Sequence, residues 1–183
     1  MSSRTLAIAL LASASVFNTG TAFAQASNST AVHVDVVAPL TVEPTAALHF
    51  GTIYSQSGAP GTVTVFPNYG IGGEKGVAGG VSWLDDTAVE PGRFEITGNP
   101  NSNYTFLASE SATLTSQGGG SMTVNGFVAV CSSTGAIDGP RGSGTLSIAD
   151  GTDQCEVGGV LQVPANVAPG SYTGDVVVEV AYQ

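Results

Sequence analysis

The chain has 183 residues, of which 42% are hydrophobic and 10% charged, with 25 glycines and a formal net charge of −10. Only 4 residues are Lys or Arg, which excludes a nucleic-acid binder that relies on clustered positive charge and also a polybasic membrane anchor. The hydrophobic content is too high for a disordered chain. This composition favours a compact β fold outside the cytoplasm.

Residues 1–24 have the organisation of a cleavable export signal. Arg4 precedes a short apolar stretch, and Ala22-Phe23-Ala24 forms a small-x-small cleavage site. The apolar stretch is shorter than the roughly 20 residues that a transmembrane helix needs, and no later stretch is longer. We therefore expect a mature chain of residues 25–183 with no membrane span, located in the periplasm, on the cell surface or outside the cell.

The mature chain is expected to consist of short strands separated by turns. Apolar and polar residues alternate with a period of two, and clusters of Gly and Pro separate the alternating segments. This pattern predicts an all-β fold, an antiparallel immunoglobulin-like β-sandwich in a single domain. Residues 68–86 alternate least, and the glycine-rich run within them, residues 70–80, is expected to form an exposed loop. The predicted strands are residues 31–42, 62–66, 93–96, 104–107, 122–130, 144–148, 157–163 and 172–182.

The first alternating segment carries Val32, Val34 and Val36 close to the start of the mature chain. Two interpretations stay open for residues 25–42. The segment is either the first strand of its own sandwich or a donor strand that completes a sheet edge of another subunit.

Cys131 and Cys155 are the only cysteines. In an exported chain an isolated pair most simply forms a disulfide. The rival, a metal or redox pair, has neither a C-x-x-C spacing nor a histidine nearby in sequence. We predict a structural disulfide.

Residues suited to catalysis are sparse. His33 and His49 both fall on the polar side of their segments, and no Gly-x-Ser-x-Gly elbow occurs. We expect no catalytic residue, no cofactor and no enzymatic activity.

Two acidic groups are candidates for a binding site. Asp150, Asp153 and Glu156 follow one another at spacings of three residues, and calcium prefers oxygen ligands of this kind. The complete calcium-loop pattern is missing, so a solvated acidic turn is the alternative. Trp83 lies two residues before the adjacent Asp85 and Asp86. A glycan or a cation would bind at these residues, and the alternative interpretation is that the tryptophan only packs locally.

The C-terminal segment is the most distinctive part of the sequence. Its apolar residues alternate, its penultimate residue is Tyr, and a Gly precedes the alternating part. This arrangement resembles the C-terminal strand of pilus subunits of the chaperone–usher type. Leu48 to Thr52 (L-H-F-G-T) also resembles a turn of those subunits and of the spore-coat-protein-U-like secreted domains. The candidate assembly residues here are Gly170, Val176, Val178, Val180 and Tyr182.

Nearly all of the mature chain is similar to a bacterial secreted family, the domain of unknown function 4402. The matching motifs are Pro39-Leu40, Leu48 to Thr52, Phe94 to Gly98, Val157 to Pro164 and Pro169 to Gly174. The resemblances imply a pilin-like sandwich and an exported structural subunit. We expect it to join other copies or subunits by strand addition, with a periplasmic chaperone as a further candidate partner. The alternative is a monomeric secreted module that binds a glycan or a cation.

Overall fold

The computed structural model describes residues 27–183 except residue 71 and residues 136–138. The chain divides into two compact units, Met1–Asp35 and Val36–Gln183. In the first unit, the described residues 27–35 carry neither strand nor helix. The predicted export signal, residues 1–24, lies outside the described residues.

The second unit is built from antiparallel strands joined by turns, and its described residues contain no helix. The prediction of an all-β antiparallel sandwich is therefore confirmed. The strands are β1 (Thr41–Ala46), β2 (Thr52–Ser55), β3 (Gly61–Val65), β4 (Lys75–Gly79), β5 (Val81–Asp85), β6 (Gly92–Thr97), β7 (Asn103–Ala108), β8 (Ser111–Thr115), β9 (Ser121–Cys131), β10 (Arg141–Thr145), β11 (Thr152–Val163) and β12 (Val178–Tyr182).

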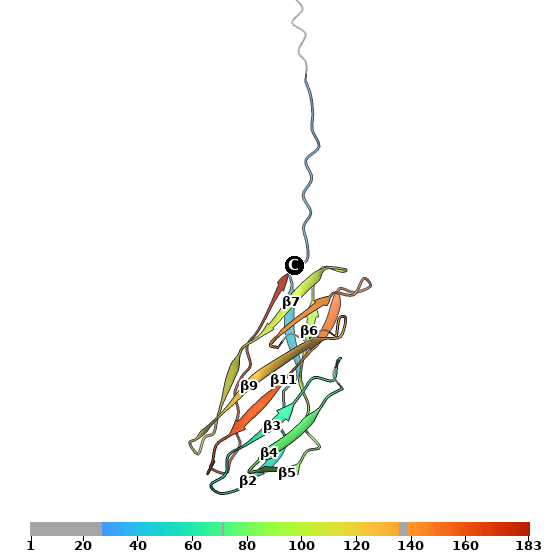
Figure 1. Ribbon diagram of the computed structural model, residues 1–183. Coiled ribbons are helices and arrows are strands. Elements are labelled where there is room, and N and C mark those ends of the chain that lie inside the picture. Colours follow the sequence, from blue (N-terminus) through green and yellow to red (C-terminus); the bar gives the residue numbers. More distant parts are fainter. Residues whose placement is uncertain (1–26, 71, 136–138) are drawn as a thin grey trace, which may run out of the picture. The chain divides into compact units, whose positions relative to one another are not determined.

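Strand β11 is the centre of the larger sheet (Figure 1). Along one edge it pairs first with β6, through residues 152–157, and then with β3, through residues 159–163. Along its other edge it pairs with β9. Strands β1, β4 and β8 extend this sheet beyond β6, β3 and β9, respectively, whereas a second sheet has the order β10-β7-β12 and a third pairs β2 with β5.

The hydrophobic core lies between the larger sheet and the β10-β7-β12 sheet. Alternate residues of β11, among them Val157 and Leu161, are buried, and so are Tyr104 and Phe106 of β7. The Phe106 ring meets the ring of Phe94 edge-on, with centroids 5.6 Å apart, a geometry that favours aromatic pairs. The period of two in the sequence thus separates core-facing from solvent-facing side chains.

Four predicted strands differ from the observed ones by more than one residue at an end. The segment 157–163 belongs to β11, which begins earlier, at Thr152. The segment 31–42 is a strand only from Thr41 onward, because no other strand of the described chain pairs with residues 31–40. The segment 144–148 ends as a strand at Thr145, and the segment 172–182 becomes one only at Val178. Alternation marks a segment that fits a sheet edge, but it does not supply the neighbouring strand.

The expectation that residues 70–80 form an exposed loop is wrong, because β4 lies within them and pairs with β3. Glycines permit this close pairing. A Cβ at Gly61 on β3 would lie 2.5 Å from the Ala78 carbonyl oxygen, and Gly79 turns the chain with a φ of +73°. Strands β2, β5 and β8 were likewise not predicted.

Candidate functional site: the β1–β12 seam

The sandwich is closed along one side and incompletely covered along the other. On the closed side β9 and β10 approach each other, and the Ala129 N–H donates to the Gly139 carbonyl at 2.9 Å. The neighbouring core residues Cys131 and Leu146 are at most 1% exposed. On the other side the edge strands β1 and β12 approach each other, but their core-facing side chains are only half-buried. We call this line the β1–β12 seam; it consists of Leu40, Val42, Val178, Val180 and Tyr182.

The outer edge of β12 offers unpaired main-chain groups. On its inner edge, the Ser109 N–H donates to the Val177 carbonyl and the Gln183 N–H donates to the Asn103 carbonyl, so odd-numbered residues of this strand bond to β7. In an antiparallel ladder the residues between them direct their N–H and C=O groups to the opposite edge. Val178, Val180 and Tyr182 therefore face an edge that pairs with no strand of the described chain.

Tyr182 connects the end of the chain to the beginning of the second unit. Its hydroxyl accepts from the Asn99 N–H at 2.7 Å and donates to the Ala38 carbonyl at 2.8 Å. Gly98 makes room for this contact, because a Cβ there would collide with the Tyr182 hydroxyl and lie 2.9 Å from Leu40 Cδ1. Two of the sequence motifs, Pro39-Leu40 and Phe94 to Gly98, thus meet the penultimate tyrosine at one place.

The C-terminal segment has the two faces that its alternation predicts. Its core-facing residues Val176, Val178, Val180 and Tyr182 are half-buried and pack against the core, whereas Asp175, Val177 and Glu179 are exposed. Gly170 lies outside any strand, where a Cβ would be 2.8 Å from Ser116 Oγ.

The N-terminal candidates are exposed. Val32, Val34 and Val36 are 89%, 83% and 89% exposed, a large apolar exposure for side chains that are usually buried. The sequence predicted the row itself but left open whether it would enter its own sandwich.

The acidic candidates do not come together. Asp150 accepts from the N–H and hydroxyl of Thr152 in an exposed turn, and these bonds hold its pKa below the ordinary value. Asp153 and Glu156 lie an odd number of residues apart on β11, so they lie on opposite faces of the sheet. Within residues 27–183, apart from the undescribed positions, no three His, Cys, Asp or Glu side chains gather as a metal site would require.

Cys131 and Cys155 form the predicted disulfide, and they lie directly opposite each other on β9 and β11. Both are fully buried. The hydroxyl of Tyr104, on the facing sheet, is 3.2 Å from Cys155 Sγ. The disulfide therefore joins two strands of one sheet within the core.

Asp153 organises the polar part of this core. Its carboxylate accepts from the Tyr104 hydroxyl at 2.7 Å, from the Ser132 hydroxyl at 2.6 Å and also from the Ser133 hydroxyl. Burial, together with the neighbouring Asp153, raises the pKa of Tyr104. The aspartate is satisfied by donors from β7 and from the turn that follows β9, so its contacts are structural.

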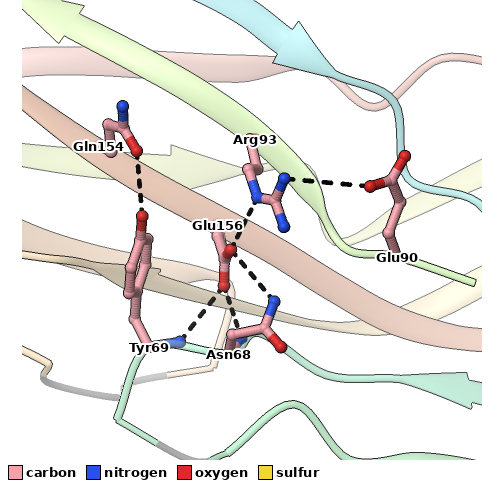
Figure 2. A network of polar contacts seen from close by, with 6 residues as sticks. All are labelled: Asn68, Tyr69, Glu90, Arg93, Gln154 and Glu156. Carbon is pink, nitrogen blue, oxygen red and sulfur yellow. Dashed lines mark hydrogen bonds and ion pairs between the residues drawn. The ribbon is translucent and has the colours of Figure 1, made fainter.

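Glu156 lies on the opposite face of β11, beneath the chain that follows β3 (Figure 2). Only 2% exposed, it accepts from Arg93 Nε at 2.9 Å, from the Asn68 N–H at 2.5 Å and from the Tyr69 N–H at 3.3 Å. Burial raises the pKa of this carboxyl, but the hydrogen bonds from Arg93, Asn68 and Tyr69 outweigh it and hold the pKa below its ordinary value. Glu90 contacts the far side of the guanidinium. Glu156 thus fixes the segment 66–69 onto the sheet.

The residues proposed for glycan or cation binding are engaged within the fold. Trp83 is half-buried, and its indole N–H donates to the Phe50 carbonyl at 3.1 Å. Asp86 pairs with Lys75 at 2.9 Å, and Asp85 accepts from the Thr87 N–H and hydroxyl. These contacts favour the packing interpretation of the tryptophan.

The histidines lie outside any gathered set of catalytic groups. His49 is exposed and forms an isolated β-bridge with Glu90, and its Nδ1 accepts from the Gly51 N–H at 2.9 Å. His33 is exposed in the first unit.

The fold and its buried contacts define a disulfide-linked, all-β sandwich domain. Residues 40–182 match the family model described as Domain of unknown function (DUF4402), so the chain belongs to this family, as the sequence motifs implied. The match begins at Leu40, the first residue of the seam. No curated protein matches the sequence. In the part of the chain that the structure describes, no helix is long and apolar enough to cross a membrane.

Proposed function

We propose that this protein is an exported, pilin-like structural subunit of a cell-surface assembly, which joins neighbouring subunits by β-strand addition. The observation that carries the proposal is the exposed row Val32, Val34 and Val36. An extended peptide with alternating apolar residues can add to a sheet edge through its main chain while one face fills the partner's apolar sites. A periplasmic chaperone is a candidate partner before assembly, because an exposed apolar row favours aggregation.

The energies indicate that the row needs a prepared edge. Burying each of the three valines would contribute about 1.5–3 kcal/mol, whereas fixing the backbone of each residue costs about 1–2 kcal/mol. Over five residues these contributions nearly cancel. Main-chain hydrogen bonds, each contributing about 0.5–1.5 kcal/mol, must therefore supply the net gain, and only an open strand edge can provide them.

The proposal includes no enzymatic activity. It is supported by the exposed positions of both histidines and by the internal hydrogen bonds of Asp153 and Glu156. A screen of the purified protein against esters, glycosides and peptides should return only background turnover. Turnover abolished by one substitution at His49 would overturn this part of the proposal.

Assembly is tested with a pair of substitutions that add the same charged group on opposite faces of the segment. The exported chain should form polymers in light scattering and electron microscopy, or require a chaperone to remain monomeric. Val34→Asp should abolish assembly, since it places a carboxylate in the apolar row. His33→Asp should assemble like the parent. Thermal unfolding should be the same for both variants, and a parent chain that is a stable monomer at all concentrations without a chaperone would refute the function.

A further inference from the structure

We propose that the β1–β12 seam of one copy accepts residues 32–36 of a second copy, and that the Tyr182 hydroxyl prevents a chain from filling its own seam. This inference rests on the proposed function and names its acceptor. It also makes the protein a self-polymerising subunit.

The acceptor is identified by two features that coincide at β12. Val178, Val180 and Tyr182 direct their N–H and C=O groups to an edge with no partner strand in the described chain. The side chains of the same residues are only half-buried, as is Val42 of β1. An added strand would bond to the free groups and cover the half-buried side chains at once.

The spacing of the donor matches the spacing of the acceptor. Alternate residues of a strand lie about 6.6–6.8 Å apart, so Val32, Val34 and Val36 would follow the row of Val178, Val180 and Tyr182 along the seam. The polar residues His33 and Asp35 would then face solvent, beside the exposed face of β12.

The other edge strands fit the donor less well. Strand β4 also lacks a second partner in the larger sheet, but Val77 is its only side chain that packs against the core. Strand β8 is partly covered, because Thr115 forms a bridge with Thr173 through two main-chain hydrogen bonds. Compared with the described edges of β4 and β8, the seam combines an open edge with a longer row of apolar residues.

The chain leading into β1 argues against insertion into its own seam. For residues 32–36 to fold back beside β12, the chain would have to reverse before Thr41. A turn with Pro39 at its second position would use the Ala38 carbonyl as its acceptor. In the structure the Tyr182 hydroxyl donates to that carbonyl at 2.8 Å and so holds Ala38 beside the end of β12, and residues 36–40 contain no turn.

Donation from one copy to the seam of the next is a heterologous contact, in which two different surfaces meet. Such contacts generate open filaments unless the rotation between subunits closes a ring. A chain that carries both surfaces therefore needs no second type of subunit to grow.

The acceptor is tested by disulfide trapping between co-expressed full-length chains. One chain carries His33→Cys or Asp35→Cys, because the register of the added strand selects one of these positions. The other carries Ala181→Cys on the exposed face of β12 or, as the matched control, Ala78→Cys on the exposed face of β4. Mass spectrometry of the oxidised polymer should identify a donor peptide linked to residue 181 and none linked to residue 78.

The outcomes separate this inference from the proposed function. Polymers that link through residue 78, or through neither position, would overturn the seam as acceptor while strand addition remained. A parent chain that never assembles would overturn both.

The role of Tyr182 is tested by removing one hydroxyl. Tyr182→Phe should shift the protein from polymer to monomer. In a chain that also carries Asp35→Cys and Ala181→Cys, the same substitution should increase the fraction of disulfide between residues 35 and 181 of one chain. Tyr172→Phe is the control, because it also removes one tyrosine hydroxyl. That hydroxyl donates to the Ala168 carbonyl at 2.8 Å, and neither residue belongs to the seam. Equal polymer fractions in the two variants would overturn the proposed role of the tyrosine.

Discussion

Replacing the buried carboxylate of Glu156 by an amide should destabilise the sandwich in a pH-dependent manner. Glu156→Gln keeps the shape of the side chain but replaces one acceptor oxygen by an NH2 group. This donor group would then face the N–H donors of Asn68, Tyr69 or Arg93, which would lose their acceptor. Removing one partner of a buried ion pair typically costs 3–5 kcal/mol. Because the Arg93 side chain is 40% exposed, we expect a smaller loss of about 2–4 kcal/mol at neutral pH.

The sign of the pH dependence follows from the lowered pKa of Glu156. Its ordinary value is 4.5, and its value in the folded protein is lower. The ionised carboxylate therefore contributes stability that is complete above about pH 4.5 and is lost as the pH falls through the folded pKa. The difference in unfolding free energy between the parent and Glu156→Gln should narrow as the pH falls from neutral into this acidic range.

Urea unfolding at a series of pH values measures this difference. Glu95→Gln is the matched control, because Glu95 lies on β6 close to Arg93 in sequence but is exposed; it should change stability by less than about 0.5 kcal/mol. Amide hydrogen exchange should also accelerate at Asn68 and Tyr69 in Glu156→Gln. A constant difference at every pH, or unchanged exchange at these amides, would refute the role assigned to the carboxylate.

Two further predictions concern the core and the seam. Non-reduced protein should yield a peptide that links Cys131 to Cys155, and replacing both by Ser should lower the unfolding free energy by about 2–5 kcal/mol in urea titrations; two free thiols in the parent would contradict the disulfide. Gly98→Ala should displace the Tyr182 hydroxyl and lower the melting temperature of the protein. Gly76→Ala is the control and should have little effect, because a Cβ there meets nothing within 4 Å. Equal melting temperatures of the two variants would contradict the packing described around Tyr182.

Sequence reasoning predicted best those strands whose alternation is reinforced by the core. Val157 to Val163 and Met122 to Val130 could be predicted because β11 and β9 direct apolar residues such as Leu161 and Val124 into the core. The disulfide could also be predicted, since compartment and cysteine number decide it without knowledge of the fold.

Where glycines replace side chains, the pattern disappears although the strand remains. Strand β4 has the sequence KGVAG, so only Val77 can signal a core-facing side. Its pairing with β3 depends on the absence of side chains at Gly61 and Gly79, a property of three-dimensional approach that alternation cannot reveal.

Glu156 shows a second limit of sequence reasoning. Its spacing from Asp150 and Asp153 suggested a shared acidic site, but parity on β11 directs Asp153 and Glu156 to opposite faces. The partners of Glu156 at Asn68 and Arg93 lie 88 and 63 residues away. Cys155 and Val157 mark the face of β11 that packs against the core. Because Glu156 lies between them in sequence, the alternation predicts that its side chain lies on the opposite face of the strand.

The two ends of the chain carry the same kind of pattern with different outcomes. Val178, Val180 and Tyr182 alternate and form a strand because β7 offers them an edge. Val32, Val34 and Val36 alternate equally well, yet no strand of the described chain pairs with them. Among the described residues, the apolar row lacks a strand to pair with and a surface to cover its side chains, and the β1–β12 seam has an unpaired edge and half-buried apolar side chains. Under the proposed assembly, a second copy of the chain would satisfy both the row and the seam, because each copy contributes one row and one seam.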